Sequence, residues 1–385
     1  MSLPAPAPEA LAHSQRLADL IRQEIRAAGG WISFARFMSM ALYAPGLGYY
    51  TAGARKFGAA GDFVTAPELT PLFGRALARQ AAQVMAASRP FILEAGAGSG
   101  RLAADLLLAL EAMGSLPERY FILDISTDLR QRQRQWLARE VPRLLERVEW
   151  LDALPESFSG LVLGNELLDA MPVHCVTWED GAVLEKGVAL DADAQFRWQD
   201  KPAGGRLLET ATAIAGECLL PPGFSSEVAL AAPAWVATWG ERLEQGCLVL
   251  LDYGFPRREF YHPQRHGGTL MCHYRHQAHP EPFYLPGLQD ITAHVDFTGI
   301  IAAAHPRGLE LLGYTSQAQF LFNCGLLQDL ETLGPGSLPY LKAAGAVQKL
   351  VQPQEMGELF KVIAIGKGLA EPLLGFARGD KSHRL

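Results

Sequence analysis

Within residues 91–165 the chain alternates short apolar runs with stretches of helical periodicity. The apolar runs are FILEAG at 91–96, YFILDIS at 120–126, VEW at 148–150 and GLVLGN at 160–165. After the first run, Leu102, Leu106 and Leu110 recur at the spacing of one helix face. Apolar strands separated by helices predict a parallel sheet with right-handed crossovers, whose ligand sites lie beyond the carboxyl ends of the strands.

The flanking segments follow other patterns. Leu17, Ile21 and Ile25 share one helical face near the N-terminus. After the alternating strands and helices of the core, the sequence has the pattern of strands without helices, with a hairpin turn at Asp180-Gly181. We therefore predict an α/β fold, a Rossmann-like sheet with a helical N-terminal region and an inserted accessory subdomain. The expected organisation is an N-terminal region with a covering loop (1–90), the first half of the core (91–175), an antiparallel insertion (176–230), the core continued (231–254), an accessory insertion (255–345) and a C-terminal core strand and tail (346–385).

A glycine-rich loop closes the first predicted strand and opens a helix. Its glycines are Gly96, Gly98 and Gly100, and Glu94 precedes them. A dinucleotide site needs G-x-G-x-x-G, but position 101 is Arg101, and the G-K-[ST] ending of a P-loop is absent. The pattern acidic-x-G-x-G-x-G is instead typical of class I methyltransferases. Glycines let S-adenosylmethionine lie against bare backbone, although a plain glycine-rich turn is the alternative.

Several neighbouring side chains are candidates to bind that cofactor. Asp124 ends the second strand, where an acidic residue can accept hydrogen bonds from ribose hydroxyls. Asp152 follows the third strand and is a candidate contact of the adenine amine. The alternative for both carboxylates is an ordinary surface or capping role. The remaining candidates for the cofactor site are Ala97, Ile125, Asn165 and Glu166.

The molecule that accepts the methyl group is expected to bind after the fourth strand, where NELLDAMPV occupies 165–173. Glu166 and Asp169 are candidate catalytic carboxylates that hold a cationic acceptor. An arginine guanidinium has a pKa above 12 and a rigid fork of donors that suits paired carboxylates. Alternatively, Asn165 and Glu166 cap a helix, and Asp169 lies on its surface.

Three further segments hold weaker candidates. Asp252, in the DYG that ends a later strand, is a candidate to line the pocket or to form a turn. His294, in DITAHVDF at 290–297, is a candidate catalytic base, and a structural histidine on a helix is the alternative. Asp62 and Thr65 lie in a long turn-rich segment that we expect to close over the cofactor; an inert ordered loop is the alternative.

Composition narrows the class of partner. Lys and Arg number 34 against 41 Asp and Glu, which gives a formal charge of −7. This balance disfavours a nucleic-acid partner and is compatible with a basic protein or peptide.

The five cysteines stand singly, without zinc-like spacing, so no metal site is predicted. No apolar run approaches the roughly 20 residues that span a bilayer, and the acidic N-terminal segment is unlike a presequence. We therefore expect a cytoplasmic protein without membrane insertion.

Taken together, the motifs carry a family resemblance along nearly the full chain. They are LYxPxxGYY at 42–50, GDFxTAPE at 61–68, ExGxGxG at 94–100, NELLDAMPV at 165–173, SEV at 226–228, DYG at 252–254, DITAHVDF at 290–297, TSQ at 315–317 and MGxxFKV at 356–362. This combination resembles the MidA-like family of S-adenosylmethionine-dependent methyltransferases. Asp124 stands where relatives often have Glu, and Ala97 and Ser99 stand where Pro and Arg are common, so details of the loop contacts differ.

The resemblance implies a class I methyltransferase sheet and a specific activity. The family includes the mitochondrial respiratory complex I assembly methyltransferase, which dimethylates an arginine of a complex I subunit. We therefore expect protein-arginine N-methylation of a respiratory-complex subunit or a similar protein partner. A small-molecule O- or N-methyltransferase and a catalytically silent assembly factor that binds the cofactor are the alternatives.

Overall fold

The computed structural model describes residues 3–53 and 65–385. The chain forms two compact units, each made of three stretches of sequence. The accessory unit comprises Met1–Phe63, Asp169–Ala234 and Phe255–Gly299, and the sheet unit comprises Val64–Leu168, Trp235–Gly254 and Ile300–Leu385.

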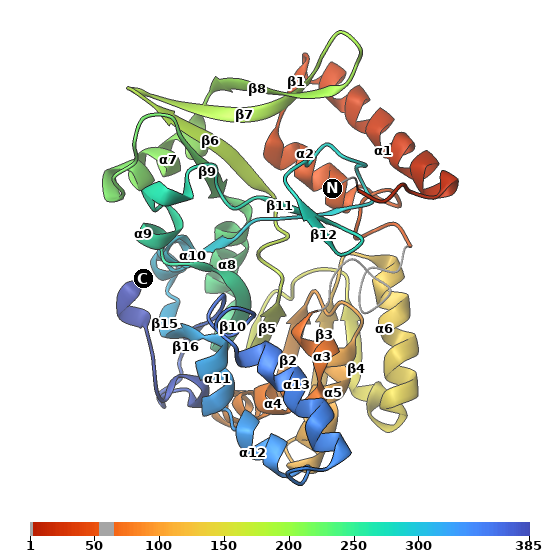
Figure 1. The fold of residues 1–385 in the computed structure, drawn as a ribbon. Coiled ribbons are helices and arrows are strands. Elements are labelled where there is room, and N and C mark those ends of the chain that lie inside the picture. Colours follow the sequence, from red (N-terminus) through yellow and green to blue (C-terminus); the bar gives the residue numbers. More distant parts are fainter. Residues whose placement is uncertain (1–2, 54–64) are drawn as a thin grey trace. The chain divides into compact units, whose positions relative to one another are not determined.

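The sheet unit is built on one mixed sheet with the strand order β15-β16-β10-β5-β2-β3-β4 (Figure 1). The strands are β2 (Phe91–Ala95), β3 (Arg119–Leu123), β4 (Val148–Leu151), β5 (Phe158–Asn165), β10 (Leu243–Phe255), β15 (Glu310–Ser316) and β16 (Phe360–Lys367). The pairs from β4 through β10 are parallel, and β16 runs antiparallel to both of its neighbours. The predicted α/β fold is confirmed, and the ends of five parallel strands meet at one edge.

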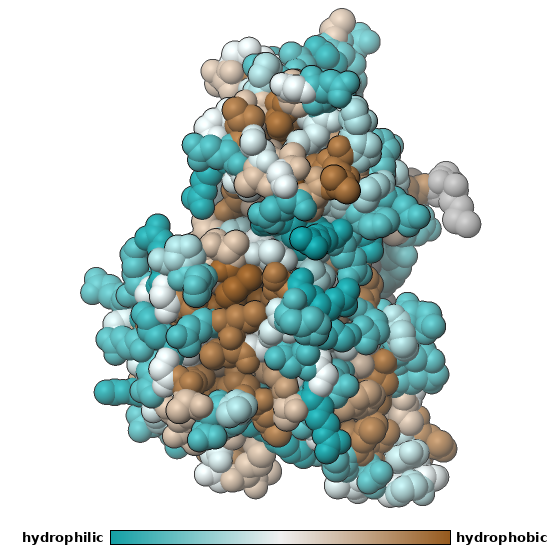
Figure 2. Space-filling model, turned by 90° about the vertical axis from the view of Figure 1, so that its left-hand side faces the viewer, coloured by the Kyte–Doolittle hydropathy of each residue, from teal (hydrophilic) through white to brown (hydrophobic). Residues whose placement is uncertain are grey.

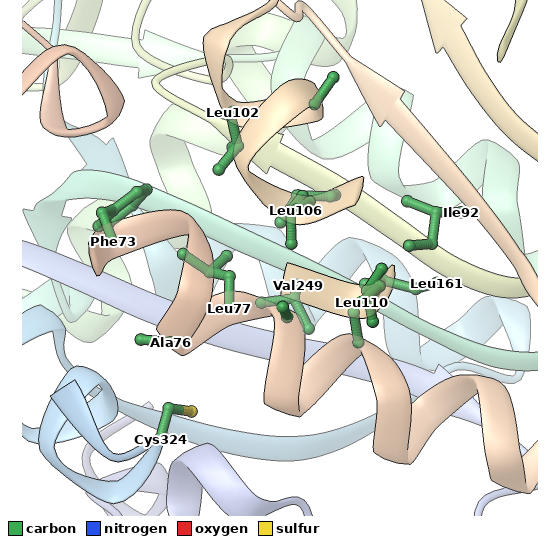
Figure 3. Close-up of a cluster of buried hydrophobic side chains, with 14 of the residues drawn as sticks. Phe73, Ala76, Leu77, Ile92, Leu102, Leu106, Leu110, Leu161, Val249 and Cys324 are labelled. Carbon is green, nitrogen blue, oxygen red and sulfur yellow. The ribbon is translucent and has the colours of Figure 1, made fainter. Parts of the chain in front are cut away.

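Helices cover the faces of this sheet, which explains why its central strands are almost continuously apolar. The helices are α3 (Ala66–Leu69), α4 (Pro71–Ala87), α5 (Arg101–Ala112), α6 (Thr127–Glu140), α11 (Gln317–Asn323), α12 (Leu326–Glu331) and α13 (Leu338–Val351). Figure 3 shows the packing: Phe73 and Leu77 of α4 and Leu106 of α5 lie together beside strand residues such as Val249.

The units cut across two of the expected boundaries. Residues 71–87 form α4, which belongs to the sheet unit and not to the predicted N-terminal region 1–90, because its apolar stripe packs into the core of the sheet unit. The predicted insertion 255–345 is also divided. Its first part, 255–299, lies in the accessory unit, whereas β15 is an edge strand of the main sheet. This strand pairs with β16 at one edge of the sheet, and its first three residues are exposed or half-buried, so its sequence lacks the continuous apolar run of a central strand.

The accessory unit is built on an antiparallel sheet with the order β1-β7-β6-β9, in which β8 also pairs with β7. Its elements are β1 (Trp31–Ser33), β6 (Val173–Glu179), β7 (Ala182–Leu190), β8 (Phe196–Pro202), β9 (Phe224–Ala229), α1 (Pro8–Ala27), α2 (Phe34–Tyr43) and α7 (Gly205–Glu217). Strand β6 is buried on both faces. Val173 and Cys175 join the cluster of α1 and α2, whereas Val176 and Trp178 join the cluster of α7, as the period of two requires.

A second, small sheet of the accessory unit has the order β12-β11-β13. The remaining elements of the accessory unit are β11 (Met271–Tyr274), β12 (Gln277–His279), β13 (Asp290–Thr292), β14 (Val295–Asp296) and α9 (Arg257–Phe260). Two further helices, α8 (Ala231–Arg242) and α10 (Phe297–Ala304), begin in the accessory unit and end in the sheet unit. Among the described residues, no helix is both long and apolar enough to span a bilayer. The face in Figure 2 shows apolar and polar residues interspersed.

Candidate cofactor and acceptor site

The glycine loop after β2 has the backbone that its sequence predicts. Gly96, Gly98 and Gly100 have φ values of 70°, 52° and 83°, a region that residues with a side chain rarely adopt. The Gly96 N–H donates to the carbonyl of Leu123 at 2.9 Å, which ties the loop to the end of β3. A Cβ atom on Gly100 would lie 3.2 Å from the Cα atom of Gln133. The loop therefore presents bare backbone at the carboxyl edge of the sheet, which suits a nucleoside.

Glu94 is a buried carboxyl group directly before this loop. Its side chain is 2% exposed, and the Tyr120 hydroxyl donates to its Oε2 at 2.7 Å. Burial raises the pKa of Glu94 from its ordinary 4.5 to about 7; the hydrogen bond from Tyr120 opposes that rise, and the Asp124 carboxylate adds to it. Glu94 is therefore protonated below neutral pH and loses its proton as the pH rises through about 7, and a neighbouring cation favours its charged form.

Asp124 ends β3 and is held by two donors. The Ser126 N–H donates to its Oδ1 at 2.9 Å, and the Gln133 Nε2 donates to its Oδ2 at 2.8 Å. Ile125 beside it is 67% exposed, an unusual position for a large apolar side chain and one that a flat base could cover. Sequence reasoning missed Gln133, because a glutamine in a polar helix resembles a surface residue.

Asp152 lies in a different environment from the other predicted cofactor contacts. Its side chain is 89% exposed and pairs with Arg130 at 2.6 Å. This geometry is that of a surface ion pair, the alternative that its sequence position left open.

The segment after the turn-rich region is anchored to the glycine loop. Thr65 immediately precedes α3, and Glu68 within α3 accepts from the Ser99 hydroxyl at 2.5 Å. The Arg101 guanidinium also donates to Glu68, at 3.1 Å. The end of the predicted covering segment therefore contacts the loop directly, while Asp62 lies outside the described residues.

The turn after β5 is strained at Glu166. Its φ is 50°, an uncommon conformation for a residue with a long side chain, of the kind that clusters at functional sites. The Asn165 amide donates to the Glu166 carboxylate at 3.2 Å. No helix begins in residues 165–173, so the alternative that Asn165 and Glu166 cap a helix is wrong. A Cβ atom on Gly96 would lie 3.1 Å from Leu167, which places this turn against the glycine loop.

Asp252 explains how the strained turn is held. Its side chain is 1% exposed, and its Oδ2 accepts from the backbone N–H groups of Leu167 at 3.1 Å and Leu168 at 2.8 Å. The Glu166 N–H donates to the carbonyl of Leu251 at 2.9 Å. Of the two interpretations of Asp252, the structure favours the turn: its carboxylate anchors β5's exit to β10.

Asp169 and His294 belong to the accessory unit. Asp169 is 5% exposed, which rules out the alternative of a surface helix residue, and its carbonyl accepts from the Ala293 N–H at 3.1 Å. His294 is half-buried between β13 and β14 rather than on a helix, and its N–H donates to the Thr269 hydroxyl at 3.0 Å. In the same unit, the Tyr50 hydroxyl donates to Asp290 at 2.9 Å.

Comparison with known proteins identifies the family. Residues 76–315 match the family model described as "Putative S-adenosyl-L-methionine-dependent methyltransferase". A crystal structure from Burkholderia thailandensis, bound to S-adenosyl-homocysteine, is 51% identical over 100% of both chains, with a TM-score of 0.96. A second, native crystal structure from that organism is 50% identical over 100% of both chains, with a TM-score of 0.93.

Curated relatives are more distant but carry specific names. "Protein arginine methyltransferase NDUFAF7 homolog, mitochondrial" of Drosophila melanogaster is 28% identical over 98% of this chain and 93% of its own. The Danio rerio relative, "Protein arginine methyltransferase NDUFAF7, mitochondrial", is 27% identical over 88% of this chain and 84% of its own. The expected cytoplasmic location is contradicted by these relatives, which are named as mitochondrial proteins.

The glycine loop supplies the physical reason for the match, since its bare backbone and flanking carboxyl groups fit the cofactor that the family uses. The chain belongs to the MidA-like family of S-adenosylmethionine-dependent methyltransferases and has the class I methyltransferase fold.

Proposed function

We propose that this methyltransferase modifies an arginine side chain of a protein. The observation that carries the proposal is the strained Glu166, held at a φ of 50° on a turn that contacts the glycine loop. A carboxylate fixed beside the cofactor loop suits a cationic acceptor, since guanidinium donors pair with carboxylate oxygens. The names of the curated relatives, which are protein arginine methyltransferases, favour the same acceptor.

We further propose how the cofactor is held. The backbone of the glycine loop, with Ala97, would lie against its methionine and ribose portions, Asp124 would accept from the ribose, and Ile125 would cover the adenine. The positive charges of the bound cofactor would favour the ionised form of the buried Glu94 carboxyl group. Thr65, Asp152 and Asn165 remain candidates for further contacts with the cofactor, and so does Asp62, which lies outside the described residues.

The chemistry asks little of the protein beyond positioning and charge. When bound, S-adenosylmethionine supplies a methyl group activated by a sulfonium. The acceptor nitrogen would form its bond to the methyl carbon while the carbon–sulfur bond breaks with its electron pair remaining on sulfur, and the proton that the nitrogen gives up would pass to a base, for which His294 is the candidate. Glu166 would orient the guanidinium and stabilise its charge, and good positioning alone supplies about 7–11 kcal/mol. Asp169 as a second carboxylate and His294 as a base stay proposals, each to be tested by its own variant.

The partner that we propose is an arginine-bearing protein, with a respiratory complex I subunit as the specific candidate implied by the family resemblance. The decisive experiment supplies methyl-labelled cofactor to the protein and a cell extract, followed by mass spectrometry of the labelled products. Methylarginine in a protein supports the proposal. Label confined to small metabolites, or no label while S-adenosylhomocysteine still binds, overturns it in favour of a small-molecule enzyme or a silent assembly factor.

Variants test whether Glu166 acts on the methyl acceptor. We expect Glu166→Gln to lower kcat by at least about tenfold with little change in cofactor affinity, because only the acceptor loses its charged partner. Glu156→Gln, an exposed carboxylate of the same unit, is the matched control and should retain activity. Unchanged turnover in Glu166→Gln would remove the acceptor role.

A further inference from the structure

Helix α6 contains a buried glutamine that its sequence conceals. The helix reads TDLRQRQRQWLARE, with glutamines at 131, 133 and 135. Gln131 and Gln135 are exposed, whereas Gln133 is completely buried at 0%. A buried amide is costly unless its hydrogen bonds are made, so the position requires an explanation.

All the polar atoms of the Gln133 side chain have partners in the sheet unit. Its Nε2 donates to the carbonyl of Gly98 at 3.0 Å and to Asp124 Oδ2 at 2.8 Å. Its Oε1 accepts from the indole Nε1 of Trp150 at 3.0 Å. An indole nitrogen can only donate, so Trp150 fixes which end of the amide faces the site. The NH₂ group must point toward Asp124 and the glycine loop.

The backbone of Gln133 contacts the same loop. A Cβ atom on Gly100 would come within 3.2 Å of the Gln133 Cα, so α6 and the loop are in close contact at this point. One side chain thus links the strand end that carries Asp124, the middle of the glycine loop and the end of β4.

We propose that Gln133 is a positioning residue for the ribose of the cofactor. It holds the Asp124 carboxylate from one side, while the Ser126 N–H holds it from the other at 2.9 Å, and it fixes the Gly98 carbonyl relative to that carboxylate. This inference rests on the proposed role of Asp124 in accepting from the ribose hydroxyls. An acceptor that is already oriented loses less entropy when it binds, which favours affinity and discrimination.

The test measures discrimination rather than affinity alone. S-adenosylhomocysteine and its 2′-deoxy analogue are titrated calorimetrically into the unmodified protein, Asp124→Ala, Gln133→Leu and the control Gln135→Leu. The unmodified protein and the control should prefer the full ribose by at least about tenfold, the worth of a hydrogen bond to a charged group. In Gln133→Leu the preference should fall below about threefold. A merely structural defect would weaken both ligands equally and leave their ratio unchanged.

A second variant separates the donor role from packing. Gln133→Glu keeps the size of the side chain and its acceptor for Trp150, but it replaces the donor to Asp124 with a negative charge. Relative to the unmodified protein at the same pH, in which Glu94 titrates as well, its preference for the full ribose should be lost at pH 8 and should recover toward pH 5, because burial beside the Asp124 carboxylate raises the pKa of the introduced acid and lets it donate again. If Gln133→Leu does not fold, this pH series decides the question.

The two proposals fail in different ways. If Asp124→Ala retains the preference, the ribose role of Asp124 is wrong. If Asp124→Ala loses it while Gln133→Leu and Gln133→Glu both retain it, Asp124 binds the ribose without help and the positioning role of Gln133 is overturned.

Discussion

Glu94→Gln should change how the stability of the protein depends on pH. The pKa of Glu94 is raised from its ordinary 4.5 to about 7, first by burial and then by the Asp124 carboxylate, against the hydrogen bond from Tyr120. Between these two values the folded protein keeps a proton that the unfolded chain has released. The stabilisation is therefore fully present below pH 4.5 and is lost as the pH rises through 7, at about 1.4 kcal/mol per pH unit.

The magnitude follows from the two pKa values. Between pH 5 and pH 8 the protein should lose about 2.5 kcal/mol of unfolding free energy through Glu94 alone. The E94Q protein lacks this loss, and its amide oxygen can still accept from the Tyr120 hydroxyl. Other titrating groups contribute equally to both proteins, so the difference between the two isolates Glu94. That difference should move by about 2.5 kcal/mol in favour of E94Q across the interval.

Urea unfolding without cofactor, at one-unit steps from pH 5 to pH 8, measures this difference directly. Glu149→Gln removes an exposed carboxylate from β4, another strand of the same sheet, and is the matched control, for which no such trend is expected. A difference between Glu94→Gln and the unmodified protein that stays constant within about 0.5 kcal/mol would refute the reasoning, because a carboxyl group ionised in both states gives no linkage.

Three other substitutions test the geometry of the sheet unit. Gly100→Ala forces a residue with a side chain to adopt a positive φ and brings its Cβ atom against Gln133, so calorimetry should show cofactor affinity reduced at least about tenfold. Gly74→Ala would bring a Cβ within 2.6 Å of the Cβ of Asp105, where α4 meets α5, and should cost about 1–3 kcal/mol in urea unfolding. Its control, Gly345→Ala in α13, meets no atom within 4 Å and should be neutral or stabilise by up to about 1 kcal/mol. Asp252→Ala leaves two turn N–H groups without their acceptor, so kcat should fall more than cofactor affinity; an equal fall in both would contradict its role in the turn.

The sequence was sufficient for the central parallel strands of the sheet and for the loop at its edge. Continuous apolar runs marked β2, β3 and β5, and the glycine spacing indicated a backbone with positive φ, which the structure has at Gly96, Gly98 and Gly100. These features depend on residues close together in the chain. Periodicity and turn chemistry are local, so they can be interpreted without knowledge of the tertiary structure.

Features that depend on distant partners were not predictable. Gln133 differs from Gln131 and Gln135 only in what the fold places against it, and Asp252 acquires its role from a turn 85 residues away in sequence. The unit boundaries of the structure differ from the expected ones for the same reason: nothing local shows that α4, within the expected N-terminal region, packs in the sheet unit.

The carboxyl edge of the sheet carries several features that stability alone would not favour. A non-glycine residue with φ of 50° at Glu166, a buried carboxyl group at Glu94 and three glycines with positive φ all lie beside the first and fourth strands of the core. Each costs free energy in the folded protein, since strain, desolvation and the conformational freedom of glycine all favour unfolding. Among the described residues of the sheet unit, Glu166 is the only non-glycine residue with positive φ, and it lies at the edge where parallel strands present ligand sites, which favours a functional explanation. Substitutions that relieve these costs, such as Glu94→Gln, should therefore stabilise the protein and impair its activity together, whereas stabilising changes elsewhere, such as Gly345→Ala, should leave turnover intact.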